Sequence, residues 1–199
     1  MSEQNKNILS RMRCNRGFTL VEMLAVIAII VTVGTIILAI VTNSLSGSGK
    51  SDAISQIRQN GSYALAQMTR VITYSKSFSG VSSDGQNYAN GCLVSQTDPT
   101  PTPVPYSSIR VTSFDGGVTT YTCEINGNAD LDTISSTSAT LQKASLLDVN
   151  NVTLTECHFT CEQVNLSDQP RIGIVFTLTS KKSPGTNSTF QTTVIPRNF

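Results

Sequence analysis

The sequence predicts an α+β protein with one long N-terminal helix followed by about five antiparallel strands. Three observations carry this prediction. The segment from Phe18 to Val41 is almost continuously apolar, apolar residues then recur every three to four positions to about residue 75, and the period changes to two from residue 107 onward. A run of helix followed by a run of strands is the order of an α+β fold.

Composition excludes several classes of function. The 199 residues include 14 basic and 13 acidic side chains, one histidine and no tryptophan. This balance gives no basic footprint for nucleic acid, and one histidine argues strongly against His pairs or His-rich metal sites. Nucleophile elbows, phosphate loops and paired acids are missing from the sequence. We therefore expect no enzyme, no cofactor and no metal site.

The apolar segment is long enough to cross a membrane. Its 24 residues would span about 36 Å as a helix, against about 30 Å of hydrocarbon. Four basic residues and one acid precede it, which predicts a cytoplasmic N-terminus and an exported C-terminal part. A secretory signal peptide fits poorly, because the run is too long and no A-x-A-like site follows. A plain signal anchor leaves the acid at Glu22 unexplained.

Glu22 stands five residues into the apolar run, where a carboxylate needs a partner or a proton. If the chain were cut after Gly17, Phe18 would carry a new ammonium group. Glu22 would then lie one helical turn away and could neutralise that ammonium or the one of a neighbouring chain.

The stretch Arg16-Gly17-Phe18-Thr19-Leu20-Val21-Glu22-Met23-Leu24 resembles the prepilin signal of type IV pilins and type II secretion pseudopilins. The resemblance covers about 30 residues. It implies that a membrane-embedded prepilin peptidase removes a leader of residues 1–17 after Gly17 and that Phe18 is N-methylated. It also implies that the helix joins other pilins or pseudopilins in a filament through an inner-membrane assembly platform, with Glu22 matched to an adjacent amine.

The helix is expected in two parts, a transmembrane and filament-core part at 18–44 and an amphipathic part at 45–75. Two glycines near residues 47–49 lower helix propensity without ending the helix. The stripe of the second part comprises Ile54, Ile57, Gly61, Ala64, Met68 and Val71, widened by Leu65 and Ile72. In pilins this half packs on a β-sheet. Residues 76–106 are predicted to be a connecting loop, rich in serine and then in proline.

Residues 107–199 are predicted to form an exported β-rich domain. Alternation and the turn at Asp115-Gly116-Gly117 predict a hairpin of Ile109–Phe114 and Val118–Ile125. Residues 131–148 are ambiguous, with a short strand around 139–143. Three more strands are expected at 152–161, 172–179 and 188–195.

Four cysteines fall in the exported part: Cys92, Cys123, Cys157 and Cys161, while Cys14 lies in the leader. An even number in an exported domain indicates disulfides, with three possible connectivities. Cys157 and Cys161 would lie about 13 Å apart in a straight strand, beyond a bridge. Either the chain turns between them or each pairs elsewhere; we favour Cys92–Cys123 with Cys157–Cys161 across a bulge or turn.

Two weaker motifs suggest metals. Cys157-His158-x-x-Cys161 offers three zinc ligands where a structural site needs four. Asn126, Asn128, Asp130 and Asp132 alternate oxygen side chains as a calcium loop does. Leu131 stands where that loop needs glycine, and no glutamate follows at the twelfth position. We expect an ordinary strand residue at His158 and a polar turn at 126–132.

These features together predict a minor pilin or pseudopilin that acts in filament assembly or priming. Residues 58–65 and 190–198 resemble W-type minor pilins and J-type pseudopilins. The expected location is the bacterial inner membrane with one span, and then an extracellular filament or pseudopilus. From Phe18 on, 10 basic and 12 acidic residues make DNA uptake the least supported use. The alternative is an uncleaved, membrane-anchored β-rich adhesin or binding module.

Overall fold

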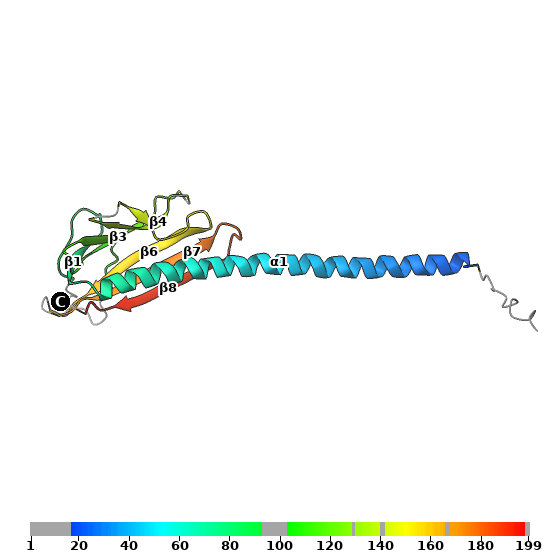
Figure 1. The fold of residues 1–199 in the computed structure, drawn as a ribbon, viewed down its shortest axis with the longest axis horizontal. Coiled ribbons are helices and arrows are strands. Elements are labelled where there is room, and N and C mark those ends of the chain that lie inside the picture. The colour runs from blue at the N-terminus through cyan, green and yellow to red at the C-terminus, as the bar shows by residue number, and fades with distance from the viewer. Residues whose placement is uncertain (1–16, 93–102, 129, 140–141, 166–167, 198–199) are drawn as a thin grey trace, which may run out of the picture. The chain divides into compact units, whose positions relative to one another are not determined.

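A long helix and antiparallel strands make up the computed structural model, which describes residues 17–92, 103–128, 130–139, 142–165 and 168–197. The predicted α+β class, with an apolar N-terminal helix packed on antiparallel sheets, is confirmed (Figure 1). The elements are α1 (Leu20–Thr73), β1 (Ser77–Ser82), β2 (Ser108–Thr112), β3 (Val118–Glu124), β4 (Thr133–Ser138), β5 (Ala144–Ser145), β6 (Val152–Glu162), β7 (Arg171–Ser180) and β8 (Asn187–Val194).

The chain divides into two units, Met1–Gly47 and Ser48–Phe199, and α1 contributes residues to both. Gly47 and Gly49 do not end the helix. In the first unit, the hydroxyls of Thr32 and Thr35 donate to the carbonyls three residues earlier, at 2.9 and 2.8 Å. Such bonds satisfy a hydroxyl inside its own helix, which suits an apolar surrounding.

The second unit contains the folded core. Residues 48–73 of α1 bury one stripe against the sheets, as the 3–4 spacing predicts: Ala53, Ile57, Gly61, Ala64, Met68 and Ile72. Leu65 and Val71 widen this stripe and are partly buried. The opposite side of the same segment is exposed, so this half of the helix has a definite inner and outer face.

At Gly61 the helix and the second sheet meet closely. A Cβ at this position would lie 2.2 Å from the ring of Phe190 on β8. Phe190 in turn stacks on Phe176 of β7, with ring centroids 5.2 Å apart. The missing side chain of Gly61 therefore makes room for an aromatic pair that joins helix to sheet.

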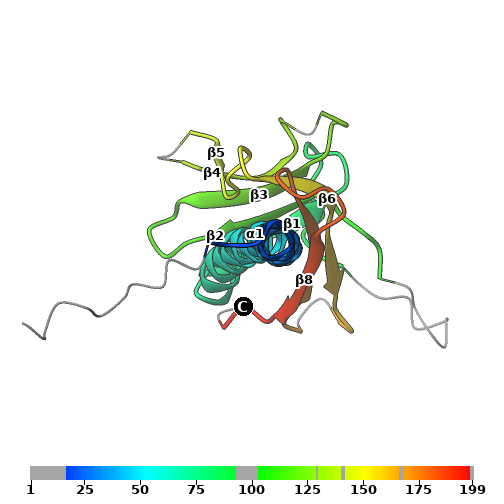
Figure 2. The ribbon, with the colours of Figure 1, turned by 90° about the vertical axis from the view of Figure 1, so that its right-hand side faces the viewer.

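Eight strands form two sheets within the described residues, where the sequence predicted about five strands in one sheet. One sheet has the order β1-β2-β3-β4-β5 and the other β6-β7-β8, with antiparallel pairing throughout. The two sheets lie on different sides of the second half of α1 (Figure 2). The hairpin β2–β3 and the strands β6, β7 and β8 confirm the predicted positions.

Two polar strands differ from the prediction. β1 lies inside the segment predicted to be a loop, because its serines pair with β2 while Phe78 and Val81 point into the core. β4 lies at Thr133–Ser138 and β5 at Ala144–Ser145, not around 139–143. β4 has one buried apolar residue, Ile134, and is held by hydroxyl bonds such as Ser135 to Glu124 at 2.7 Å. Alternation of apolar residues does not reveal such strands.

Candidate functional site

The N-terminal end of α1 is built around Thr19. Gly17 and Phe18 precede the helix, and Phe18 is 73% exposed. The carbonyl of Thr19 accepts the N–H of Met23 at 3.2 Å, and its hydroxyl accepts the N–H of Glu22 at 3.2 Å. Thr19 is therefore the N-cap. This role was not predicted from the sequence, although the spacing Thr19-x-x-Glu22 matches a capping box and could have revealed it.

Glu22 occupies the third position of the helix, in its first turn. The free N–H groups there give this end a partial positive charge, which favours a carboxylate. The side chain is exposed, so its carboxylate can pair with a positively charged group outside the described residues. The structure thus places Gly17, Phe18 and Glu22 together at one helix terminus, with the peptide bond between Gly17 and Phe18 outside the helix.

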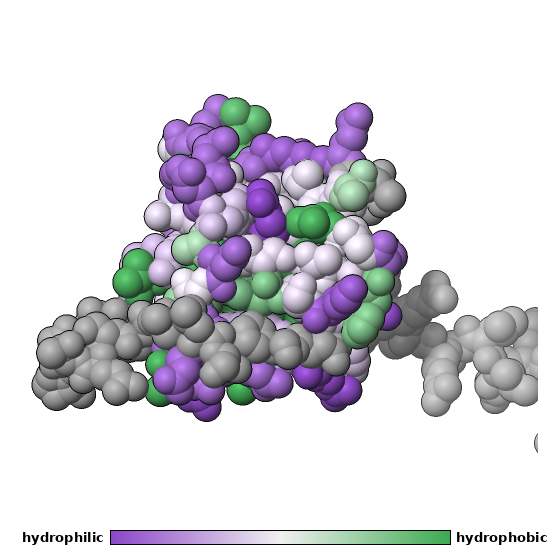
Figure 3. All heavy atoms as spheres, turned by 90° about the vertical axis from the view of Figure 1, so that its left-hand side faces the viewer, coloured by the Kyte–Doolittle hydropathy of each residue, from purple (hydrophilic) through white to green (hydrophobic). Residues whose placement is uncertain are grey.

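The first unit of the chain presents apolar side chains on every side. α1 has the length and composition to cross a membrane, and its apolar window is not buried. Exposed residues include Leu20, Leu24, Ile27, Ile30, Ile37 and Leu45. In the face of the folded unit drawn in Figure 3, by contrast, apolar residues are scattered among polar ones. An apolar surface of this extent requires lipid or other helices around it.

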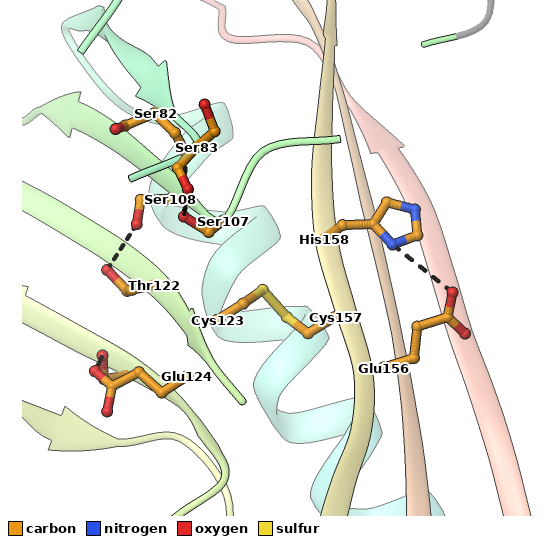
Figure 4. The surroundings of a disulfide bond; sticks show 11 residues. Ser82, Ser83, Ser107, Ser108, Thr122, Cys123, Glu124, Glu156, Cys157 and His158 are labelled. Carbon is orange, nitrogen blue, oxygen red and sulfur yellow. Dashed lines mark hydrogen bonds and ion pairs between the residues drawn. A yellow bond between two sulfur atoms is a disulfide. The ribbon is translucent and has the colours of Figure 1, made fainter. Parts of the chain in front are cut away.

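The disulfide pairing that we favoured is wrong. The structure joins Cys92 to Cys161 and Cys123 to Cys157, each with Cα atoms 5.6 Å apart. Cys157 and Cys161 both lie in β6, which continues without a turn between them. Both residues are on the face of β6 that packs against the core. Four residues of strand keep them about 13 Å apart. Cys123–Cys157 therefore links β3 to β6 and ties the two sheets (Figure 4).

His158 is a strand residue on the other face of β6 from Cys157 (Figure 4). Its Nδ1 lies 3.9 Å from Oε1 of Glu156. Both neighbouring cysteines are in disulfides and supply no thiolate. Across the described ranges, no group of three His, Cys, Asp or Glu residues is placed to hold a metal ion.

Three of the oxygen side chains in the turn at 126–132, those of Asn128, Asp130 and Asp132, bind other groups of the protein. Asp132 is buried, and its Oδ1 accepts the N–H of Asn126 at 2.6 Å. Asn128 accepts the N–H of Asp130 at 3.2 Å, and Asp130 pairs with Lys181. These bonds occupy oxygen atoms that a calcium ion would need. The segment is therefore a polar turn held by its own hydrogen bonds.

Two exposed carboxyls elsewhere in the second unit close tight turns. Hydrogen bonds from the Ser82 hydroxyl, and then from the N–H groups and amide of Asn87 and Gln86, hold the pKa of Asp84 far below its usual range. The Asn151 amide and then the Asn150 N–H lower the pKa of Asp148. The Asp148 N–H also donates to Asn60 of α1 at 2.9 Å, which attaches this turn to the helix.

These features define a class of protein: a membrane-length apolar helix, capped at its start, that continues into a disulfide-bonded α+β unit. Comparison with family models makes the class more particular, because residues 12–42 match the prokaryotic N-terminal methylation motif. The chain therefore carries the prepilin signal of type IV pilins and pseudopilins. This motif marks structural subunits and not an enzyme family. Comparison with curated proteins and with solved structures gave no match.

Proposed function

We propose that the protein is a minor pilin or pseudopilin, a processed and N-methylated subunit of a type IV pilus or type II secretion pseudopilus. The observation that carries this proposal is the methylation motif at residues 12–42, which includes the exposed apolar start of α1 with an acid in its first turn. The subunit is not an enzyme, and its action is assembly: it primes or joins a filament through this helix.

Processing is assigned to the bond between Gly17 and Phe18. This bond lies before the first helical residue, so a peptidase can reach non-helical backbone there without unwinding α1. Gly17 has no neighbouring atom within 4 Å of a Cβ built on it. Cleavage by the prepilin peptidase would leave Phe18 as the N-methylated first residue, next to the cap at Thr19.

Glu22 is assigned to subunit registry. Helices that meet only through apolar side chains can slide along one another. A carboxylate that must find the ammonium of a neighbouring Phe18 fixes one position along the axis. A buried ion pair gives little net stability, but removing one partner costs about 3–5 kcal/mol.

The precursor is placed in the bacterial inner membrane, with a cytoplasmic leader and the unit from Ser48 onward exported. Its partners are the prepilin peptidase, other pilins or pseudopilins, and an inner-membrane assembly platform. Nucleic acid is not among the expected partners. The resemblance of residues 58–65 and 190–198 to W-type minor pilins and J-type pseudopilins supports a minor, priming role.

N-terminal mass spectrometry of the protein from membranes of its native host tests the proposal first. We expect a chain that begins at N-methylated Phe18. A chain that begins at Met1 or Ser2, while the peptidase is active on another prepilin, contradicts the proposal and supports the uncleaved adhesin.

The Glu22→Ala variant separates processing from assembly. We expect normal cleavage and strongly reduced incorporation into filaments, because the Phe18 ammonium would lose its partner. Asp52→Ala is the matched control, since Asp52 is the next acid along α1 and lies in the second unit. Normal incorporation of the Glu22→Ala variant into filaments would contradict the registry role assigned to Glu22.

The minor role is tested by counting subunits in purified filaments with quantitative mass spectrometry. A priming subunit is expected in few copies relative to the most abundant subunit. Equal abundance along the filament would make this chain a major subunit.

A further inference from the structure

A pocket of about 290 Å³ lies in the second unit between α1 and the turn that joins β7 to β8. The same turn lies beside α1 in Figures 1 and 2. The helix supplies two cations and two apolar side chains, and the turn supplies hydroxyl and amide groups. The lining residues are Lys50, Ile54, Ile57, Arg58, Gly185, Thr186, Asn187 and Ser188.

The positive charge of this pocket is not balanced from within. Lys50 and Arg58 are exposed, and neither forms an ion pair with any residue in the described ranges. The four helical lining residues fall within an arc of about 100° around α1. Asp52, the nearest acid along the chain, lies on the opposite side of the helix and does not line the pocket.

The polar wall matches a phosphodiester. Ser188 offers a hydroxyl and Asn187 an amide, which can donate to phosphate oxygens or accept from a polyol, while the Thr186 hydroxyl also pairs with that of Ser183 at 3.2 Å. Ile57 is buried beneath, with Ile54 half-buried beside it, so the floor is apolar. A ligand with an anionic head, polar substituents and an attached hydrocarbon part satisfies all of these groups together.

The pocket is tied closely to the apolar segment. Lys50 follows Leu45, the last exposed large apolar residue of the first unit, by five residues. Five residues of helix rise about 7.5 Å, and even a fully extended chain of this length reaches only about 18 Å. A membrane surface exerts its charge over a Debye length of about 8 Å at physiological salt. Lys50 is therefore tethered close enough to the apolar segment to reach lipid headgroups.

We propose that this pocket binds the phosphodiester headgroup of an anionic phospholipid while the subunit waits in the membrane. Lys50 and Arg58 neutralise the phosphate, and the β7–β8 turn donates to its oxygens. Binding would hold the exported unit against the membrane surface until the helix is withdrawn. The proposal requires only that the apolar part of α1 is inserted in a bilayer, and does not depend on filament assembly.

The test uses the full chain in nanodiscs at one chain per disc. The reaction of each lysine with an amine-acylating reagent is followed by peptide mass spectrometry, in phosphatidylcholine and in phosphatidylcholine mixed with phosphatidylglycerol. One cation near an anionic lipid surface contributes about fivefold in affinity. We expect the anionic lipid to slow labelling of Lys50 by about that factor relative to Lys76, an exposed lysine of the same unit outside the pocket.

Two variants make the test specific. Arg58→Gln removes the second cation without touching Lys50 and is expected to abolish the protection. Arg70→Gln is the matched control, since Arg70 is exposed on the side of α1 away from Lys50, and is expected to leave it intact. Equal slowing at Lys50 and Lys76, or protection that survives Arg58→Gln, would mean general surface charge and overturn the proposal.

Two further measurements identify the occupant. Soluble glycerol phosphate added to neutral discs is expected to give no protection, and protection equal to that of the lipid would overturn the lipid assignment. Protection in neutral discs that appears only with several chains per disc would also overturn it, because the occupant would then be an acidic group of a second copy.

Discussion

The two parts of α1 share one helix and differ in what surrounds them. Residues 20–41 are apolar around the whole circumference and bury almost nothing, whereas residues 48–73 bury one stripe and expose the rest. The first part is suited to a uniform apolar solvent and the second to a fixed protein core. An apolar side chain therefore stabilises the fold only in the second part, and in the first part it determines where the chain can reside.

The largest expected contrast comes from removing one large apolar side chain from each part of the molecule. Phe176→Ala should lower the free energy of unfolding by about 3–5 kcal/mol, because Phe176 is fully buried and stacks on Phe190. Ile30→Ala should change it little, since Ile30 is 64% exposed. Thermal unfolding of the full chain in detergent micelles measures both. A large loss in the Ile30 variant would contradict the contrast.

Removing the bridge between the sheets should have the next largest effect. Replacing both Cys123 and Cys157 with alanine is expected to cost about 2–4 kcal/mol, since the unfolded chain gains freedom. The paired replacement of Cys92 and Cys161 is the matched comparison. Non-reducing peptide mapping should also recover Cys92 with Cys161, and a Cys157–Cys161 peptide would refute the pairing.

Replacing each of two glycines of α1 with alanine should change stability in opposite directions. Gly61→Ala is expected to destabilise by about 1–3 kcal/mol, because the new Cβ would meet the Phe190 ring. Gly47→Ala has open space around it and should raise helix stability by up to about 1 kcal/mol. Circular dichroism at the helix band during unfolding distinguishes the two. A stabilised Gly61 variant would show that Phe190 moves freely.

The smallest effect concerns pH. Asp84 and Asp148 have folded pKa values below the usual value of 3.8. The stability that their ionised carboxylates contribute to the fold is therefore complete above pH 3.8 and is lost as the pH falls below it. We expect the unfolding temperature of the second unit to decrease as the pH is lowered below about 4. The Asp84→Asn variant should show a smaller decrease. The apolar part of α1 should keep its helical signal over the same range.

The apolar helix and the methylation motif of the first unit are predictable because their signals are local. The apolar run, the acid at Glu22 and the small residue at Gly17 are read from adjacent positions. The positions of β2, β3, β6, β7 and β8 are also predictable, most clearly that of β7, which alternates apolar residues such as Ile172, Ile174 and Phe176.

The remaining features depend on contacts between distant residues. β1 and β4 are held by hydroxyl bonds and strand pairing, for which serine and threonine give no periodic signal. The disulfides follow from which face of β6 carries Cys157 and Cys161, and spacing alone left three connectivities open. The pocket joins residues 50–58 to residues 185–188, and no motif in the sequence connects these segments.

Both disulfides end on β6, and one lies inside the other: Cys92–Cys161 encloses Cys123–Cys157. This nesting sets how far the oxidised chain can be stretched by a force applied to its ends. The outer bridge spans 69 residues, which removes roughly 240 Å of contour length from any extension. Reduction would release that length, so a subunit pulled in its oxidised form would extend only through residues outside the ring.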